Sequence, residues 1–119
     1  MLSSDKQERK NSPMCEGLLD YFPDALAAVA AVSKIGNDQH NPGKKMHWAR
    51  GKSSDHADCI IRHLVDRGRL DSDKARHSAK VAWRALALLQ EEIEAEQVLA
   101  GLPKEVAAGR ASIFPKEKG

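Results

Sequence analysis

Residues 73–99 read DKARHSAKVAWRALALLQEEIEAEQVL and contain neither glycine nor proline. Alanine and leucine recur through this run every three or four residues, which is the period of an amphipathic α-helix. Other apolar residues, among them Trp83, fall between these positions, so more than one face of the helix is apolar. Such a helix needs partners beyond its own small domain, and we expect a homo-oligomer, either a dimer or a tetramer.

The composition of the 119-residue chain favours helices elsewhere as well. Alanine is abundant, aromatic residues make up only 4%, and β-branched residues are sparse. We therefore predict an all-α fold: a compact domain of three to four helices over residues 16–102, a flexible arm at 1–15 and a tail at 103–119. Two cysteines without metal-ligand spacing, and no secretory or long apolar segment, predict a cytoplasmic protein without a membrane partner.

Two shorter helices are expected before the long one. The first is predicted over residues 23–34, because Pro23 suits a first turn and Gly36 would end the helix. The second is predicted over about residues 54–67, with Ser53 or Ser54 as its cap. The spacing of its apolar side chains predicts a buried stripe made of Ala57, Ile60, Ile61, Leu64 and Val65.

The connection between these two helices is basic. Residues 40–52 read HNPGKKMHWARGK, without an acidic residue. Cationic side chains can neutralise phosphates, glycines admit a close backbone approach, and a tryptophan face can stack on a base. We predict a loop that binds a phosphate-bearing ligand with a flat ring; a solvated loop with Trp48 as a core plug is the alternative. The predicted ligand-binding residues are His40, Lys44, Lys45, His47, Trp48, Arg50, Lys52, His56, Arg62, His63 and His77.

A second basic surface is expected on the long helix. His77, Lys80 and Arg84 share a stripe there, and a helical hairpin would turn this stripe toward Arg62, His63 and the basic loop. The formal net charge of +2 is too small to indicate a nucleic-acid partner, and helices of mixed charge argue against one. A helical interaction protein whose loop meets an acidic partner remains a further alternative.

Hydrolysis is the alternative to simple binding. Cleavage of a nucleoside triphosphate by an all-α protein needs carboxylate pairs on facing helices, because Mg²⁺ or Mn²⁺ bridges phosphates through oxygen ligands. The available pairs are Asp55 with Asp58, and Glu91 with Glu94. A metal site built from His56, His63 and His77, with or without Asp55, matches no known histidine motif. We therefore expect no cofactor, or Mg²⁺ or Mn²⁺ if the chain is a hydrolase.

Several short motifs follow one another in a fixed order. They are Phe22 and Pro23 with the helix to residue 30, the Gly36 loop, His47 and Trp48, Gly51, Arg62 and His63, the turn at residues 68–71, and His77 before the alanine-rich residues 79–89. In this order, residues 19–89 resemble the N-terminal domain family of dATP/dGTP diphosphohydrolases, which is found largely in phages. The chain departs from the family pattern at Arg69, where an acid is usual, and near Ala79, where a second histidine is usual.

The resemblance implies a nucleotide ligand. In two-domain relatives the MazG-type carboxylate cluster belongs to a separate domain, so the resemblance implies binding more directly than cleavage. The pocket chemistry is also similar to that of phage anti-CBASS sponge proteins, which sequester cyclic nucleotide immune signals. We therefore expect non-catalytic sequestration of a purine nucleotide or cyclic (di)nucleotide in the cytoplasm of an infected host cell.

Overall fold

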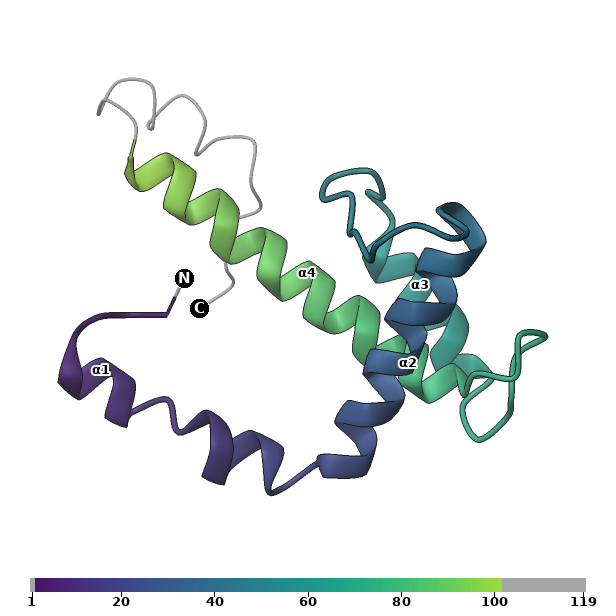
Figure 1. Ribbon diagram of the computed structural model, residues 1–119, viewed down its shortest axis with the longest axis horizontal. Helices are drawn as coiled ribbons and strands as arrows, with labels where there is room; N and C mark the ends of the chain where they lie inside the picture. The colour runs from purple at the N-terminus through teal and green to yellow at the C-terminus, as the bar shows by residue number, and fades with distance from the viewer. Residues whose placement is uncertain (1, 102–119) are drawn as a thin grey trace.

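The computed structural model describes residues 2–101, which form an all-α domain as the sequence predicts (Figure 1). Within this part of the chain, the strand-like pairing is one isolated antiparallel bridge between Leu70 and Arg76. The predicted tail at 103–119 lies outside the described residues. Residues 2–101 contain four α-helices and one π-helical turn: α1 (Lys6–Lys10), η1 (Cys15–Leu19), α2 (Pro23–His40), α3 (His56–Val65) and α4 (His77–Ala100).

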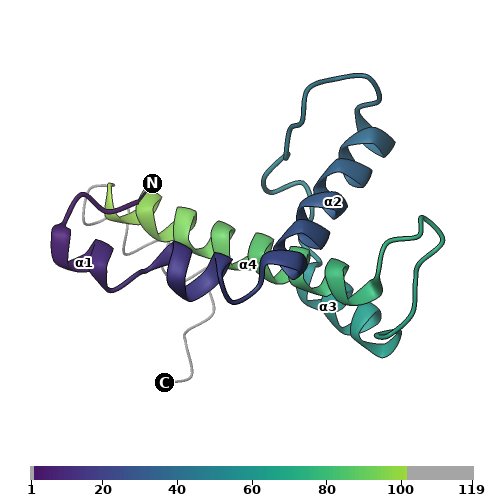
Figure 2. The same cartoon turned by 60° about the horizontal axis from the view of Figure 1, so that its bottom comes forward.

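Helix α4 is the element on which the domain is assembled. Helices α2 and α3 both pack against α4, whereas they do not contact each other. Figures 1 and 2 show both helices grouped around the N-terminal half of α4. Trp83 in this half donates its indole N–H to Ser33 Oγ of α2 at 2.7 Å. This hydrogen bond satisfies the only polar atom of a large apolar side chain and fixes α2 on α4.

The N-terminal segment stands away from α4. Among the described helices, η1 contacts α2 alone, and α1 contacts none of the others (Figure 1). The predicted flexible arm contains α1, whose N-cap Asp5 accepts a hydrogen bond from the Glu8 backbone N–H at 2.9 Å. Large apolar side chains at the end of this N-terminal segment, just before α2, are therefore left exposed. They are Leu18, Leu19, Tyr21 and Phe22.

Helix α2 is longer than the sequence predicts. The predicted end before Gly36 is wrong, because α2 continues to His40. Gly36 does not adopt the left-handed conformation of a terminating glycine, and a Cβ there would meet nothing within 4 Å. The helix extends far enough to carry Asn37, which is only 5% exposed, into the base of the following loop. That loop therefore spans residues 41–55.

Helix α3 buries the face opposite to the one that its apolar pattern predicts. His56, Cys59 and His63 are buried on the side of α4, while Ile61 and Val65 are 61% and 73% exposed. The predicted buried stripe is therefore wrong for Ala57, Ile61, Leu64 and Val65, which are exposed, whereas Ile60 is half-buried. His56 and His63 find polar partners on α4, as buried imidazoles require. The helix also begins at His56, after Asp55 and not after a serine cap.

The core of the described residues is small. The buried apolar side chains are Val29, Cys59, Ala79 and Ala87. Farther along α4 the apolar face is uncovered, and Leu86, Leu89 and Ile93 are exposed. None of the described helices is both long enough and apolar enough to cross a membrane.

Candidate functional site

A groove of about 800 Å³ runs along α4, between α2, residues 41–55 and α3. Its lining combines aromatic, cationic and imidazole side chains. Most of the residues predicted from the sequence as ligand-binding line this groove: His40, His47, Trp48, Lys52, His56, Arg62 and His63. The others, Lys44, Lys45, Arg50 and His77, are not part of the lining. Two members of the expected α4 stripe, Lys80 and Arg84, line the same groove, whereas the third, His77, does not.

Asn37 ties the first part of the loop to α2. Its side-chain amide N–H donates to the Lys44 carbonyl at 3.1 Å, and its Oδ1 accepts from the His47 backbone N–H at 3.1 Å. A buried asparagine therefore satisfies two backbone groups that a loop without secondary structure cannot pair within itself. The basic residues 44 and 45 are held at the outer edge of the loop, where both are exposed.

Trp48 packs the second part of the loop against α4. Its ring meets that of Trp83 edge to face, with 5.8 Å between the ring centroids. The Arg50 guanidinium carbon lies 4.3 Å from the Trp48 centroid, which is cation–π geometry. Trp48 therefore packs against α4, as the alternative prediction of a core plug has it, and it also lines the groove.

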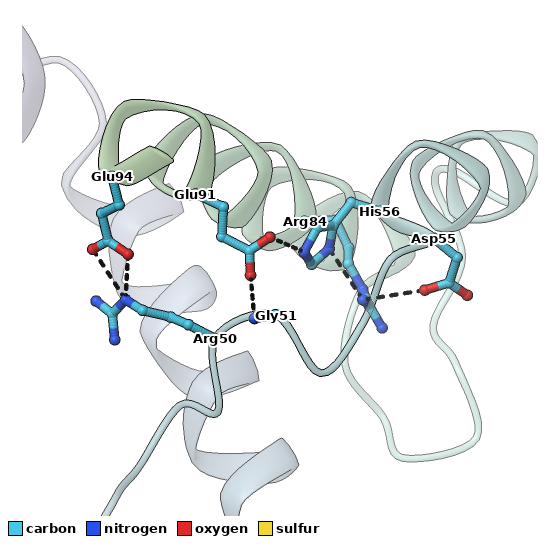
Figure 3. A network of polar contacts seen from close by, with 7 residues as sticks. All are labelled: Arg50, Gly51, Asp55, His56, Arg84, Glu91 and Glu94. Carbon is cyan, nitrogen blue, oxygen red and sulfur yellow. Dashed lines mark hydrogen bonds and ion pairs between the residues drawn. The ribbon is translucent and has the colours of Figure 1, made fainter. Parts of the chain in front are cut away.

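Two glutamates of α4 fasten the loop beyond Trp48 (Figure 3). Glu91 accepts a hydrogen bond from the Gly51 backbone N–H at 3.0 Å, and Glu94 pairs with Arg50 at 2.8 Å. Hydrogen bonds from Gln90 and then Arg50 lower the pKa of Glu94. Glu94 is therefore ionised at neutral pH in the position that the loop requires.

His56 links the loop network to α3 (Figure 3). Its Nε2 lies 3.1 Å from Glu91 Oε2, and its Nδ1 lies 3.2 Å from Arg84 Nη1. Because arginine can only donate, Nδ1 must accept, and the proton of the neutral ring is assigned to Nε2, which donates to Glu91. This chain of contacts explains why a histidine is buried between α3 and α4.

The loop between α3 and α4 is organised by its own backbone. Asp71 N–H donates to the Ala75 carbonyl at 2.8 Å, and His77 N–H donates to the Arg69 carbonyl at 3.1 Å. Lys74 has a φ of 69°, a left-handed conformation at the tip of the turn. The long helix begins only at His77, so its predicted start at residue 73 is wrong.

Lys80 binds both aspartates of this loop. Its ammonium donates to Asp71 Oδ2 at 2.7 Å and to Asp73 Oδ2 at 2.6 Å. The hydrogen bonds from Lys80 and from the Ser72 N–H lower the pKa of Asp71 to about 2. Burial disfavours the charged form of Lys80, but the two carboxylates outweigh it and raise the pKa of the ammonium.

Two imidazoles meet beside this cluster. His63, in the last turn of α3, and His77, the first residue of α4, bring their Nδ1 atoms to 2.9 Å. His63 is 8% exposed, and burial followed by the nearby Arg62 charge lowers its pKa. Asp71 completes a group whose ligand atoms lie within 4.8 Å of one another. Sequence spacing could not show this group, because it depends on how the hairpin folds back.

The four carboxylates of the hydrolase alternative do not gather in this way. Within residues 2–101, the group of three or more potential metal ligands is the one formed by His63, Asp71 and His77. Glu91 and Glu94 instead hold the loop. Asp55 Oδ1 lies 4.0 Å from Arg84 Nη1, and Asp58 is exposed on α3.

Comparison with known protein families assigns the domain. A family model described as dATP/dGTP diphosphohydrolase, N-terminal, matches residues 3–100. The chain belongs to this family. Searches of curated proteins and of solved structures found no match.

The match to the dATP/dGTP diphosphohydrolase N-terminal family extends beyond the resemblance seen in residues 19–89. It begins at residue 3, so α1 and η1 belong to the family region although they stand away from α4. It ends at residue 100, at the C-terminal end of α4. The whole groove, with both loops that border it, lies inside the match, and the family is nucleotide-related by its description.

Proposed function

We propose that this domain binds a purine nucleotide or a cyclic (di)nucleotide in the groove along α4 and holds it without cleaving it. The observation that carries this proposal is the meeting of aromatic and cationic side chains in one groove of a nucleotide-related family domain: Trp48, Trp83, Lys52, Arg62 and Arg84. The groove volume of about 800 Å³ also falls in the range of roughly 300–1,000 Å³ that small-molecule sites occupy.

Phosphate binding is assigned to the cationic side chains that are not already neutralised by a carboxylate at short range. Lys52 is exposed at the end of the loop, and Arg62 contributes from α3. Arg84 contributes from α4, and the carboxylate paired with it, that of Asp55, is 4.0 Å away. A phosphate placed among these side chains would accept charge-assisted hydrogen bonds from three different elements. Lys80 is less suited, because Asp71 and Asp73 already bind it.

Base stacking is assigned to Trp48. The Arg50 guanidinium covers one face of its ring, so a base either uses the opposite face or displaces Arg50. Displacement is feasible because the Arg50 side chain is 51% exposed and retains Glu94 as its partner. In the displaced arrangement the guanidinium would remain close enough to stack on the base or to contact its phosphate.

Retention without cleavage is supported by the use that the fold makes of its acidic residues. Glu91 and Glu94 hold residues 50 and 51, so recruiting them as Mg²⁺ ligands would release the loop that borders the groove. Metal-dependent pyrophosphate cleavage needs several carboxylates directed at one position. In the described part of the chain, the carboxylates of the two predicted pairs are directed elsewhere.

A retention experiment tests the proposal. The purified protein is incubated separately with dATP, dGTP and a panel of cyclic dinucleotides, with and without Mg²⁺ or Mn²⁺, then desalted and denatured, and the released compounds are analysed by chromatography and mass spectrometry. We expect an intact nucleotide to be recovered in a fixed ratio to protein. Recovery of nucleoside monophosphate and pyrophosphate would establish the hydrolase instead, and no retention of any nucleotide would overturn the proposal.

Two substitutions locate the bound nucleotide. Trp48→Ala is expected to weaken binding by about 1–3 kcal/mol, the usual contribution of base–aromatic stacking. Lys52→Gln removes a groove cation without breaking any hydrogen bond of its side chain within the described residues and should weaken binding as well. Lys34→Gln is the matched control, because Lys34 pairs with Asp38 on the surface of α2 and does not line the groove. Equal affinity of all three variants would contradict the assignment to this groove.

We further propose that the domain forms a homo-oligomer. Apolar side chains in and just after η1 and on the outer face of α3 are exposed, and the core of the described residues is small. A second copy could cover the α3 face, Ile61, Leu64 and Val65, with Leu18, Leu19 and Phe22, since apolar patches on two parts of one chain favour self-association. Light scattering on the purified protein measures the subunit number, and a monomer at micromolar concentration would overturn this proposal.

A further inference from the structure

The group formed by His63, Asp71 and His77 lies at the end of the groove where α3 passes into α4. Nothing in the proposed nucleotide site uses the contact between the two imidazoles. Their Nδ1 atoms are 2.9 Å apart, and a carboxylate oxygen of Asp71 lies within 4.8 Å of both. We propose that these three side chains form a binding site for one divalent transition-metal ion such as Zn²⁺ or Co²⁺.

The donor set fits such an ion. Two imidazole nitrogens and one carboxylate oxygen suit Zn²⁺, Co²⁺ and related ions, whereas Mg²⁺ prefers oxygen ligands. Two nitrogens bound to one tetrahedral Zn²⁺ at about 2.0–2.1 Å are roughly 3.3 Å apart, so the two rings need to separate by only a few tenths of an ångström. Three protein ligands leave a further coordination position, and both His63 and Asp71 line the groove from which that position is reached.

The fold holds the three donors in place without the ion. His63 is fixed by burial at the end of α3, and the backbone hairpin carries Asp71 and His77 back toward it. The Asp71 carboxylate is oriented by Lys80 and by the Ser72 N–H, at 2.7 Å each. A carboxylate can accept two such hydrogen bonds and still present a lone pair to a metal, and such supporting contacts are characteristic of metal sites.

The local charge is compatible with a cation. Asp71 and Asp73 outnumber Lys80 within their hydrogen-bonded cluster, and the C-terminal turn of α3 adds partial negative charge beside His63. Arg62 and the N-terminus of α4 oppose binding, so we expect a moderate and not an extreme affinity. In the hydrogen bond between the imidazoles, one of the two Nδ1 atoms carries the proton. When the metal binds, this proton moves through water to Nε2 of the same ring, so both Nδ1 atoms become free to bind the ion and no proton is lost.

Titration with Co²⁺ tests the site. The protein is prepared without a histidine tag, treated with chelator and titrated with Co²⁺, whose visible absorption reports coordination by nitrogen and oxygen; bound Co²⁺ is then displaced with Zn²⁺. We expect saturation at one ion per chain. His77→Gln and Asp71→Asn should each weaken binding at least about tenfold, since even changes to residues that only support a ligand cost that much.

Controls separate this site from incidental binding. His40→Ala removes a histidine at the end of α2, and Asp58→Asn removes an exposed carboxylate of α3; both variants should bind Co²⁺ as the unsubstituted protein does. In the unsubstituted protein, Zn²⁺ should change the NMR chemical shifts of Nδ1 in His63 and His77 alone. This measurement tests the ligand assignment even if a variant fails to fold. The proposal is overturned by the absence of saturable binding, by equal weakening in the control variants, or by shifts at other histidines.

Discussion

The two loops on either side of α3 are held in place in different ways. Residues 41–55 depend on side chains from distant parts of the chain, chiefly Asn37 of α2 and Glu91 and Glu94 of α4. Residues 66–76 form a hairpin with their own backbone bonds, and one side chain, Lys80, secures it. The first loop is therefore shaped by the packing of three helices, while the second is largely a local structure. Both border the same groove, so they can be perturbed separately.

The largest effect is expected from releasing the second loop. Lys80→Gln removes the ammonium that bridges Asp71 and Asp73, and leaves two neighbouring carboxylates without their shared partner. Because two partly buried charge-assisted bonds are lost together, we expect the free energy of unfolding to fall by about 3 kcal/mol, as measured by urea denaturation. Lys34→Gln, which breaks an exposed pair, should cost less than about 1 kcal/mol. Similar losses in the two variants would show that the hairpin does not need Lys80.

A smaller effect is expected from releasing the first loop. Asn37→Ala removes both hydrogen bonds between α2 and the loop backbone, and we expect a loss of about 2 kcal/mol in unfolding free energy. Hydrogen exchange should become faster in residues 41–55 and remain unchanged in residues 66–76. Asn11→Ala is the control, because the Asn11 side chain makes only an exposed contact with Gln7. Faster exchange in both loops would contradict their independence.

Acid should weaken the second loop through Asp71. Its pKa in the folded protein, about 2, lies below the ordinary value of 3.8, so the unfolded chain binds this proton more readily. The stabilisation is complete above pH 3.8 and is lost as the pH falls from 3.8 to about 2. Thermal unfolding followed across this range should show the loss, and it should be much smaller in Lys80→Gln. An identical pH profile for the two proteins would exclude the Lys80 bond as its cause.

The smallest effect on the stability of the chain is expected on the outside of α3, between the loops. Ile61→Ser and Val65→Ser change exposed side chains and should alter the unfolding free energy of a monomer by less than about 0.5 kcal/mol. If this face lies between two copies, the same changes should lower the molar mass measured by light scattering, whereas Asp58→Ser should not. An unchanged mass would move the interface elsewhere.

The helices of this domain could be predicted from the sequence because their signals are local. The run at residues 73–99 contains no breaker, and Pro23 begins a helix as expected. Gly36 misled the prediction of a helix end, because its backbone stays helical and does not turn into the left-handed conformation in which glycine commonly ends a helix. Whether Asn37 belongs to a helix or to a loop depends on partners seven and ten residues away.

The buried face of α3 could not be predicted from its own residues. The aliphatic pattern favours burying Ile61 and Val65, whereas the structure buries His56 because Glu91 and Arg84 of α4 pair with both of its ring nitrogens. Most of the residues predicted to bind a ligand line the groove, since cations, histidines and a tryptophan in and beside one glycine-containing loop form a local signal. The contact between His63 and His77 was not, because it depends on the hairpin that joins their helices.

The packing of α2 and α3 on α4, without contact between the two, has a mechanical consequence. Both helices are attached to α4. No direct contact between α2 and α3 limits how far apart they can move. A ligand that touches His40 of α2 and Arg62 of α3 would bridge the two helices and restrict their relative motion. Part of the binding free energy would then offset the conformational entropy that the two helices lose. A second ligand that binds after the first would meet a smaller entropic cost.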